Sequence, residues 1–344
     1  MDFDLLLKLT DLDGVSSAED EVRAFIREFS APYADDVSED IMGNLHIHKC
    51  GRARPEKKIL LAAHMDEVGF IVKSIGDDGG LRVAPIGGVD RRVVIGKRVR
   101  VGRDKLPGVL GIKAVHLVTP EERKSVPRWS DLTIDIGASD RASAASRVSV
   151  GDIAAFDAAA ARFGDGCIKA KALDDRIGCA ILLSLLSIEL PYDVHFLFSA
   201  QEEVGLRGAI PAAYRIAPDI ALVVEGTTAS DLPGIPEHKR VCKLGGGPAL
   251  PFLDGGARYD AGLHALLHAL GEKYNIPVQN KEHVSGGTDG GAIQRSRVGA
   301  RVACMSAPVR YIHSPSGVAC LNDIEAMREL AYRFIETVGG SSDV

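Results

Sequence analysis

The stretch Ile59–Val72, ILLAAHMDEVGFIV, places a histidine and two acids between two apolar runs. Its first five residues, Ile59–Ala63, have the length and apolar continuity of a strand that is buried on both faces. Charged side chains are rarely buried beside such a strand unless they are paired or bind a ligand. His64, Asp66 and Glu67 therefore indicate chemistry at the end of a core strand.

Three further apolar runs of strand length follow, with helical segments between them. The strand candidates are 194–200 (VHFLFSA), 220–224 (IALVV) and 300–305 (ARVACM), and the helical segments include 174–190 and 260–274. Nearly continuous apolar strands that alternate with helices are typical of α/β domains. We therefore expect an αβα sandwich with a mainly parallel central sheet.

The segment 70–163 has a different character, with short β-like pieces separated by glycine turns, such as 79–90 (GGLRVAPIGGVD). Strands of this length and spacing suit a small barrel or sandwich. We expect a compact β-rich domain at 70–163, inserted into an α/β domain that comprises 1–69 and 164–344.

Composition and charge exclude several classes of partner. The 344 residues carry a formal net charge of -6 and show no basic cluster, so we expect no binding to nucleic acid or to an anionic membrane. The first 30 residues lack a signal peptide pattern, and no apolar run is long enough to span a membrane. We therefore expect a cytoplasmic protein.

The six cysteines are scattered along the chain without a C-x-x-C pair, so they predict neither a disulfide framework nor a thiolate zinc site. We expect them to pack as small buried hydrophobes.

Each predicted core strand ends near a residue that could bind a metal ion, and two further candidates lie at a helix start and in the segment RYIHSPSG. The candidates are His64, Asp174, Glu202, Glu203, Glu225 and His313. Ligands in open α/β sheets bind beyond the carboxyl ends of the strands, where these side chains are expected to meet.

Each candidate alone has a simpler explanation. Asp174 could cap a helix, His313 could be a hydrogen-bonded histidine in a turn, and Glu202 and Glu203 could lie in a solvated loop. The argument for a site rests on the recurrence of such residues at the ends of several core elements.

Two histidines with three or four carboxylates suit divalent ions of borderline hardness such as zinc, cobalt or manganese. There are more candidate ligands than one tetrahedral ion needs, which indicates two ions. Two such ions lower the pKa of a water molecule and polarise a carbonyl group, as amide hydrolysis requires. A carboxylate outside the ligand set would serve as general base.

Seven motifs in order resemble those of the M42 metallopeptidases, the glutamyl-aminopeptidase or TET-aminopeptidase family. They are AHMDEVGF, KALDDRIG, QEEVGLRGA, VEGTTASDLPG, GGGPAL, SGGTDGGAI and RYIHSPSG. The resemblance covers nearly the whole chain. It implies a phosphorylase/hydrolase-like αβα catalytic domain, an inserted PDZ-like β domain used in assembly, and a dinuclear zinc or cobalt aminopeptidase that acts on peptides. It also implies a homo-oligomer, often a tetrahedral particle of twelve subunits.

The resemblance assigns a role to each candidate. One metal ion would be held by His64, Asp174 and Glu225. The other would be held by Asp174, Glu203 and His313, so that Asp174 bridges the two ions. Glu202 would be the general base, and Asp66 would hold an imidazole ligand in the required tautomer.

The chain departs from the family pattern at three positions. Many members have aspartate where this chain has Glu225, lysine where it has Gly246, and an acid where it has Gly317. The glycine at 246 is expected to loosen a loop near the site.

The glycine-rich segment Ser285–Ile293 lacks the spacing and the lysine of a phosphate loop. We expect its backbone to approach the cleft, with Thr288 and Asp289 lining it near the substrate; an ordinary turn is the alternative.

The favoured function is removal of single residues from the amino end of short peptides. A glycoside hydrolase that uses Glu202 and Glu203 is one alternative, although adjacent residues on an extended chain point to opposite faces. A metal-dependent deacylase and a non-catalytic metal-binding or assembly protein are the others.

Overall fold

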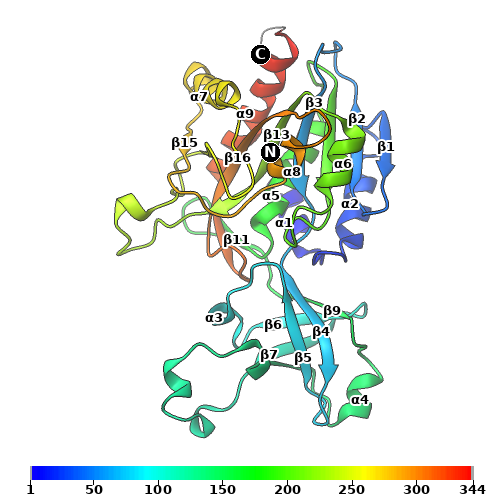
Figure 1. Ribbon diagram of the computed structural model, residues 1–344, viewed down its shortest axis with the longest axis vertical. Coiled ribbons are helices and arrows are strands. Elements are labelled where there is room, and N and C mark those ends of the chain that lie inside the picture. Colours follow the sequence, from blue (N-terminus) through cyan, green and yellow to red (C-terminus); the bar gives the residue numbers. More distant parts are fainter. Residues whose placement is uncertain (1, 342–344) are drawn as a thin grey trace.

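The computed structural model describes residues 2–341 as two lobes, a larger lobe of sheet and helices and a smaller β-rich lobe (Figure 1). Met1 and residues 342–344, which belong to the predicted domain ranges, lie outside the described residues. The larger lobe is built from both ends of the chain, whereas the smaller lobe is built from one segment of its first half.

A sheet of eleven strands forms the core of the larger lobe. Its main path is β1-β2-β12-β3-β13-β16-β17-β11-β10, and β14 and β15 pair beside β16. The strands are β1 (Asp36–Glu39), β2 (Leu45–Lys49), β3 (Ile59–His64), β10 (Ala161–Phe163), β11 (Cys167–Ala170), β12 (Val194–Ser199), β13 (Ile220–Thr228), β14 (Ala249–Leu250), β15 (Gln279–Asn280), β16 (Arg301–Arg310) and β17 (Gly317–Cys320).

The sheet is mixed, which corrects the prediction of a mainly parallel sheet. The four central strands β12, β3, β13 and β16 run parallel, whereas the pairs toward both edges are antiparallel. The cause at the edges is connection length, since only residues 40–44 join β1 to β2 and only residues 164–166 join β10 to β11. Connections this short allow antiparallel pairing alone.

Helices cover both faces of the sheet because its central strands are apolar on both faces. In β3, Ile59 and Leu61 pack in one core cluster, and Leu60 and Ala62 pack in another on the opposite face. The helices on the first face are α1 (Phe3–Asp11), α2 (Asp20–Ser30), α5 (Leu173–Leu186), α7 (Ala261–Tyr274) and α9 (Leu321–Gly339), and those on the second are α6 (Ala209–Ile216) and α8 (Gly290–Gln294).

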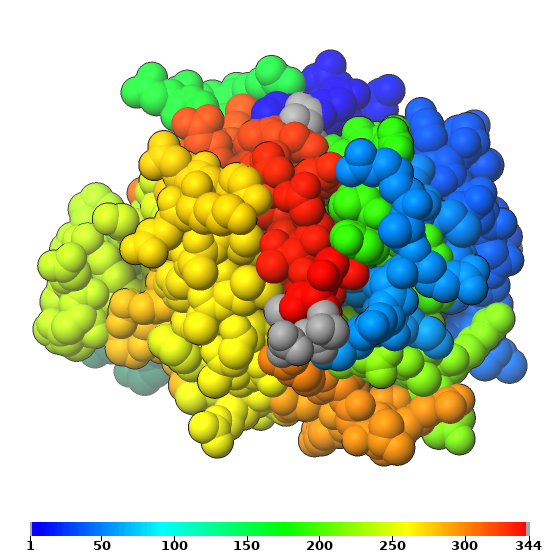
Figure 2. Space-filling view, turned by 90° about the horizontal axis from the view of Figure 1, so that it is seen from above, coloured from blue at the N-terminus to red at the C-terminus, as the bar shows by residue number. Residues whose placement is uncertain are grey.

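The C-terminal helix α9 packs on the first face of the sheet, and the C-terminus lies at the top of the larger lobe in Figure 1. Seen from above, α9 lies in red between the yellow segment that contains α7 and the blue segments of the first strands (Figure 2). Arg333 forms ion pairs with Glu329 and Glu336 along this helix, at 2.9 and 3.0 Å. Within residues 2–341, no helix is both long enough and apolar enough to cross a membrane.

The smaller lobe is a closed barrel of six strands in the order β4-β5-β8-β7-β6-β9. Its strands are β4 (Gly69–Ile75), β5 (Leu81–Ile86), β6 (Arg98–Val101), β7 (Leu106–Gly111), β8 (Thr133–Asp135) and β9 (Ile153–Phe156). Phe70 and Phe156 meet edge to face in its core, with ring centroids 5.3 Å apart. The two lobes also contain short helices. These are α3 (Arg91–Val94), α4 (Arg141–Ala145) and the 3₁₀ turns Val115–Leu117, Glu122–Lys124, Trp129–Asp131 and Glu237–Lys239.

The barrel ends earlier in the chain than the predicted insertion 70–163. Its last strand stops at Phe156, and β10 (Ala161–Phe163) pairs with β11 in the large sheet. The sequence pattern is the same on both sides of this boundary, since β9 and β10 are both short strands next to turns. Pairing partners, which lie far away in the sequence, decide where each strand belongs.

The six cysteines are free thiols in two environments. Four of them, Cys179, Cys242, Cys304 and Cys320, are buried. Cys50 is exposed and Cys167 is half-buried, so the expectation of buried packing is wrong for these two. Cys50 directly follows β2, where the chain leaves the sheet.

Candidate functional site

A cleft of about 660 Å³ opens at the carboxyl ends of the central parallel strands. His64 ends β3, Glu202 and Glu203 follow β12, and Glu225 lies in the second half of β13. The five predicted metal ligands and the predicted general base all line the cleft. The ligands are His64, Asp174, Glu203, Glu225 and His313, and the base is Glu202.

The carboxylate of Asp174 lies between two imidazole rings. Its Oδ1 is 3.4 Å from His64 Nε2, and its Oδ2 is 3.4 Å from His313 Nε2. His313 Nε2 is also 3.0 Å from Glu203 Oε1. Ligand atoms of His64, Asp174 and Glu203 all lie within 4.8 Å of one another, as a shared cation would require.

The opposite nitrogen of each ring faces a backbone carbonyl. His64 Nδ1 is 3.1 Å from the Asp66 carbonyl oxygen, and His313 Nδ1 is 3.0 Å from that of Gly88. A carbonyl only accepts, so each Nδ1 carries the proton, and a neutral ring then has its lone pair on Nε2. Without a metal ion, a proton on each Nε2 lies between the ring and the carboxylate, and a metal ion can take the place of that proton. The donor set therefore fits divalent metal ions.

Several ionisable side chains lie close together in this cleft. Burial raises the pKa of Glu202 and Glu225 well above the usual range, and neighbouring carboxylates add to the effect. Burial lowers the pKa of His313, but its contacts with Asp174 and Glu203 outweigh this and raise it to about 11. Buried carboxylates that outnumber the nearby cations are the setting in which proteins bind metal ions.

Asp174 and Asp175 divide two tasks at the start of α5. Both have non-helical backbone angles, so the regular helix begins after them. Asp175 Oδ1 accepts from the Gly178 amide at 2.8 Å, which is the capping interaction, and its Oδ2 accepts from the His64 amide at 3.1 Å. Asp175 thus acts as the cap, and the Asp174 carboxylate is left for the cleft, held by the Gly226 amide at 3.2 Å.

Asp66 organises the acidic turn after β12 more directly than it organises an imidazole. Its Oδ1 and Oδ2 accept from the amides of Glu202 and Glu203, at 2.9 and 3.1 Å, and its Oδ2 accepts from the Ser16 hydroxyl at 2.6 Å. Its Oδ1 is farther from His64 Nδ1, at 3.4 Å. The carboxylate therefore fixes the backbone that carries the predicted base.

Glu225 lines the cleft but lies outside the compact group of three ligand residues. The Ser306 hydroxyl donates to its Oε1 at 3.3 Å, and Cys304 Sγ lies 3.7 Å from the same oxygen. These contacts from β16 hold the longer side chain against the sheet. Its ligation of a metal ion stays a prediction.

Thr288 and Asp289 lie behind the cleft wall, at 1% and 2% exposure. Thr288 Oγ1 contacts the Tyr259 hydroxyl at 2.8 Å, and Asp289 accepts from the Ser199 hydroxyl. The cleft itself is lined by residues 285–287. The expectation that Thr288 and Asp289 line the cleft is corrected, because both side chains are buried behind residues 285–287, and Asp289 Oδ1 has no hydrogen-bond partner among the described residues.

The loop around Gly246 is held firmly, which corrects the expectation of a loose loop. The amides of Gly245 and Gly247 donate to the two carboxylate oxygens of Asp323, each at 2.8 Å. A Cβ at Gly246 would lie 2.6 Å from the Gln279 side chain, which fills the space that another side chain would need.

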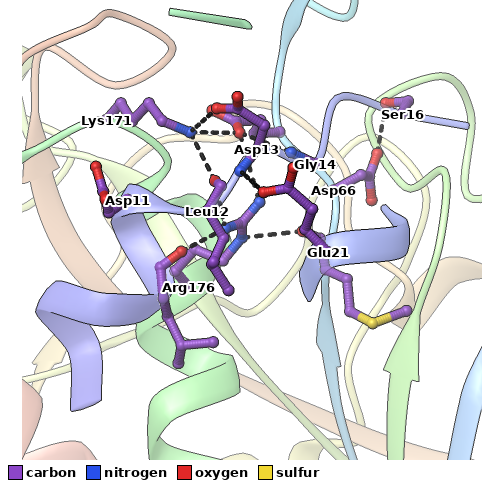
Figure 3. A network of polar contacts seen from close by, with 12 residues as sticks. Asp11, Leu12, Asp13, Gly14, Ser16, Glu21, Asp66, Lys171 and Arg176 are labelled. Atoms are coloured by element: carbon purple, nitrogen blue, oxygen red, sulfur yellow. Dashed lines mark hydrogen bonds and ion pairs between the residues drawn. The ribbon is translucent and has the colours of Figure 1, made fainter. Parts of the chain in front are cut away.

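The sequence did not lead us to predict a buried network of charged residues around Lys171 and Arg176, which Figure 3 shows. Lys171 Nζ donates to Glu67 Oε1 at 2.6 Å and to the Leu12 carbonyl at 2.8 Å, and Arg176 Nε donates to the Met65 carbonyl at 3.0 Å. Both cations are fully buried. They fix the segment that follows His64, where β3 meets the cleft. The available signal was the pair of cations that flanks Asp174 in an apolar context.

The barrel also reaches the cleft, through the turn that follows β5. Gly88 supplies the carbonyl that faces His313 Nδ1, and a Cβ at Gly88 would lie 3.2 Å from that nitrogen. Gly87, with φ of +76°, passes close to Glu203. Only glycine allows the backbone to approach both side chains so closely.

Comparison with known proteins gives matches over nearly the whole chain. The family model of the M42 glutamyl aminopeptidases matches residues 43–330. A lysyl aminopeptidase of Pyrococcus furiosus is 32% identical over 345 residues, which cover 98% of this chain and 97% of that protein. Both lobes fall within these matches.

Two solved structures superpose closely. An aminopeptidase of the archaeon Desulfurococcus kamchatkensis has a TM-score of 0.91 at 36% identity and covers 99% of this chain and 98% of its own. The TET1 peptidase of Pyrococcus horikoshii, described as able to assemble into a tetrahedron or a large octahedral shell, has a TM-score of 0.84 at 33% identity over 96% of this chain and 98% of its own.

Proposed function

Because the chain belongs to the M42 family of glutamyl aminopeptidases and is a peptide-bond hydrolase, we propose that it removes amino-terminal residues from short peptides with the help of two divalent metal ions. The observation that carries the proposal is the Asp174 carboxylate, each of whose oxygens faces the Nε2 atom of a different histidine, His64 or His313.

In this proposal His64, Asp174 and Glu225 would hold one ion. Asp174, Glu203 and His313 would hold the other. Zinc or cobalt fits the mixed nitrogen and oxygen donors best, with manganese as a third candidate. When bound, two such ions lower the pKa of a water molecule and polarise the carbonyl of the scissile bond.

Glu202 is the general base. It lines the cleft next to Glu203 but is not part of the compact ligand group, so its carboxylate is left to accept a proton. It takes that proton from the attacking water and returns it to the amine that leaves. Asp66 is a positioning residue, since both of its carboxylate oxygens hold the backbone of this acidic turn.

We further propose that the active form is a homo-oligomer. The support is the similarity over nearly the full length to a peptidase described as forming a tetrahedron or an octahedral shell. Native mass spectrometry of the purified chain tests this, with a twelve-subunit mass as the expected result. A monomer at micromolar concentration would contradict it.

The test of the activity uses chelated protein and a panel of aminoacyl-p-nitroanilides. Activity should vanish on chelation and return with zinc, cobalt or manganese. Glu202→Gln should keep its metal ions, counted by mass spectrometry, and lose about 10²–10⁴-fold in kcat. Glu237→Gln, at an exposed acid, is the matched control. Equal turnover by Glu202→Gln and the wild type would refute the assigned role.

The same assay separates the alternatives. In a glycoside hydrolase Glu203 would act directly on a sugar, but here it faces His313 at 3.0 Å. Release of reducing sugar that resists chelation would support the glycosidase. Preference for N-acylated over free amino-terminal substrates would support a deacylase.

A further inference from the structure

A second group of side chains able to bind a metal ion lies outside the cleft, at the opposite end of β12. Ligand atoms of His48, Cys50 and Asp193 all lie within 4.8 Å of one another. His48 is in β2, Cys50 directly follows β2, and Asp193 directly precedes β12. The group is half-exposed, whereas the cleft ligand His64 is only 3% exposed.

The register of the antiparallel pair explains why these residues meet. His48 lies directly opposite His195, and Lys49 lies opposite Val194. Cys50 is two residues beyond His48, and Asp193 is two residues before His195. Side chains two residues apart on a strand point to the same face, so all four lie on one face of the pair.

We propose that His48, Cys50 and Asp193 form a surface site for a divalent metal ion of borderline-to-soft character, of which Zn²⁺ is the representative. One imidazole, one thiolate and one carboxylate are the donors that such an ion accepts, and they differ from the thiol-free ligand set predicted for the cleft. Three protein ligands leave one position of a tetrahedral ion to solvent or to a fourth group.

The backbone that carries the three ligands is held in place without a metal ion. The Gly51 amide donates to Asp193 Oδ1 at 2.9 Å, and the Cys50 amide donates to Asp35 Oδ2 at 2.7 Å. The Arg52 amide donates to the Leu190 carbonyl at 3.0 Å, which continues the pairing beyond the strands. Light-blue residues near 50 lie beside green residues near 190 on the outer surface (Figure 2).

The imidazole ligand is also held. The ring centroid of His195 lies 4.6 Å from that of His48, so the two rings pack against each other. His195 Nδ1 is in turn 2.9 Å from His46 Nε2, which fixes the orientation of the His195 ring. A ligand whose ring is already confined loses less conformational freedom when it binds an ion.

The group lies among two carboxylates, Asp35 and Asp193, and two surface cations, Lys49 and Arg54. Asp35 and Asp193 bring two carboxylates to Cys50, and Asp193 Oδ2 forms an ion pair with Nε of the exposed Arg54 at 3.5 Å. An exposed arginine is displaced from a carboxylate at little cost, because surface ion pairs are weak.

The test is a titration of the chelated full-length protein with Co²⁺, followed by absorption spectroscopy. Cys50 is the soft ligand of the proposed site. A thiolate bound to Co²⁺ gives a sulfur-to-metal charge-transfer band that nitrogen and oxygen ligands do not give. We expect the band in the wild type and its loss in Cys50→Ser. The charge-transfer band does not depend on turnover, so it tests the surface site independently of the proposed aminopeptidase activity.

Two matched variants control for the other thiols. Cys167→Ser removes another thiol that is not buried, and Cys304→Ser removes the thiol next to Glu225 in the cleft. Both should keep the band. A wild type without the band, or a band that survives Cys50→Ser, would overturn the proposal.

A second measurement tests the carboxylate and imidazole ligands, Asp193 and His48. Asp193→Asn and His48→Ala should each weaken Co²⁺ binding at the band-forming site at least about tenfold, since even groups that only orient metal ligands contribute about 10–100-fold. Glu202→Gln should leave the band and its affinity as they are. An unchanged affinity in both Asp193→Asn and His48→Ala would also overturn the proposal.

Discussion

The cluster in the cleft and the cluster beside β2 and β12 use similar side chains but are assembled in different ways. The cleft cluster gathers His64, Asp174, Glu203 and His313 from segments that are far apart in the chain. The surface cluster needs only one antiparallel pair and its register. The cleft cluster thus depends on the convergence of distant segments, whereas the surface cluster depends on the pairing of two neighbouring strands.

The contacts around the two clusters also differ. Behind the cleft, Lys171, Glu67 and Arg176 are buried and bonded to the segments that carry the ligands. Around the surface cluster, the described contacts are backbone amides, the Asp35 carboxylate, the His195 ring and the exposed Arg54. Substitutions should therefore have large effects at the first cluster and small effects at the second.

The largest effect is expected from Asp174→Asn, because the two proposed ions would share this carboxylate. We expect kcat/KM on aminoacyl-p-nitroanilides to fall by more than about 10⁴-fold, beyond the 10²–10⁴ that a general base alone contributes. The number of ions bound per chain should fall as well. Asp175→Asn, at the neighbouring cap, is the comparison variant, and a larger activity loss there than in Asp174→Asn would contradict the division of tasks.

The next effect concerns stability rather than catalysis. Glu67→Ala removes the carboxylate that pairs with both buried cations, Lys171 and Arg176, and leaves Lys171 with Asp13 at 3.4 Å. It should cost about 3–5 kcal/mol of unfolding free energy, since a buried cation then lacks its counter-charge. Chemical denaturation of the metal-free protein measures this. The double variant Glu67→Ala with Lys171→Met should recover part of the loss. Additive losses would argue that the two side chains do not act as a pair.

A smaller effect is expected where the barrel meets the cleft. Gly88→Ala places a Cβ 3.2 Å from His313 Nδ1 and should turn the ring or displace its carbonyl partner. We expect a loss of about 10–100-fold in affinity for the ion at the His313 position, with the other position unaffected. Isothermal titration of the chelated protein with zinc reports both. An unchanged affinity would show that the ring does not depend on this carbonyl.

The smallest effect is expected at the surface cluster. Cys50 is exposed, so Cys50→Ser should leave the melting temperature of the metal-free protein unchanged within measurement error. With zinc present, the wild type should gain more in melting temperature than the variant, because an ion that binds only the folded state stabilises it. An equal gain in both proteins would count against the second site.

The sequence predicted the cleft because apolar strands that end in metal-ligand residues are visible without any knowledge of pairing. His64 and Glu225 are recognised in this way, and β13 and β3 do lie side by side. The edges of the sheet could not be predicted, since β10 resembles the barrel strands and only its partner β11 assigns it to the sheet.

Long-range hydrogen bonds account for the other differences. Thr288 and Asp289 follow glycines that line the cleft, but their buried partners Tyr259 and Ser199 turn them away from it. The role of Lys171 depends on Glu67, more than a hundred positions earlier in the chain. Asp193 and Cys50 become neighbours only through the register of β2 and β12.

The carbonyl of Gly88 belongs to the smaller lobe, yet it orients an imidazole of the larger one. A change in the orientation of the barrel would therefore withdraw the acceptor that faces His313 Nδ1 and would weaken the proposed metal position. By linkage, an ion held at that position would stabilise the present orientation of the two lobes by the same free energy.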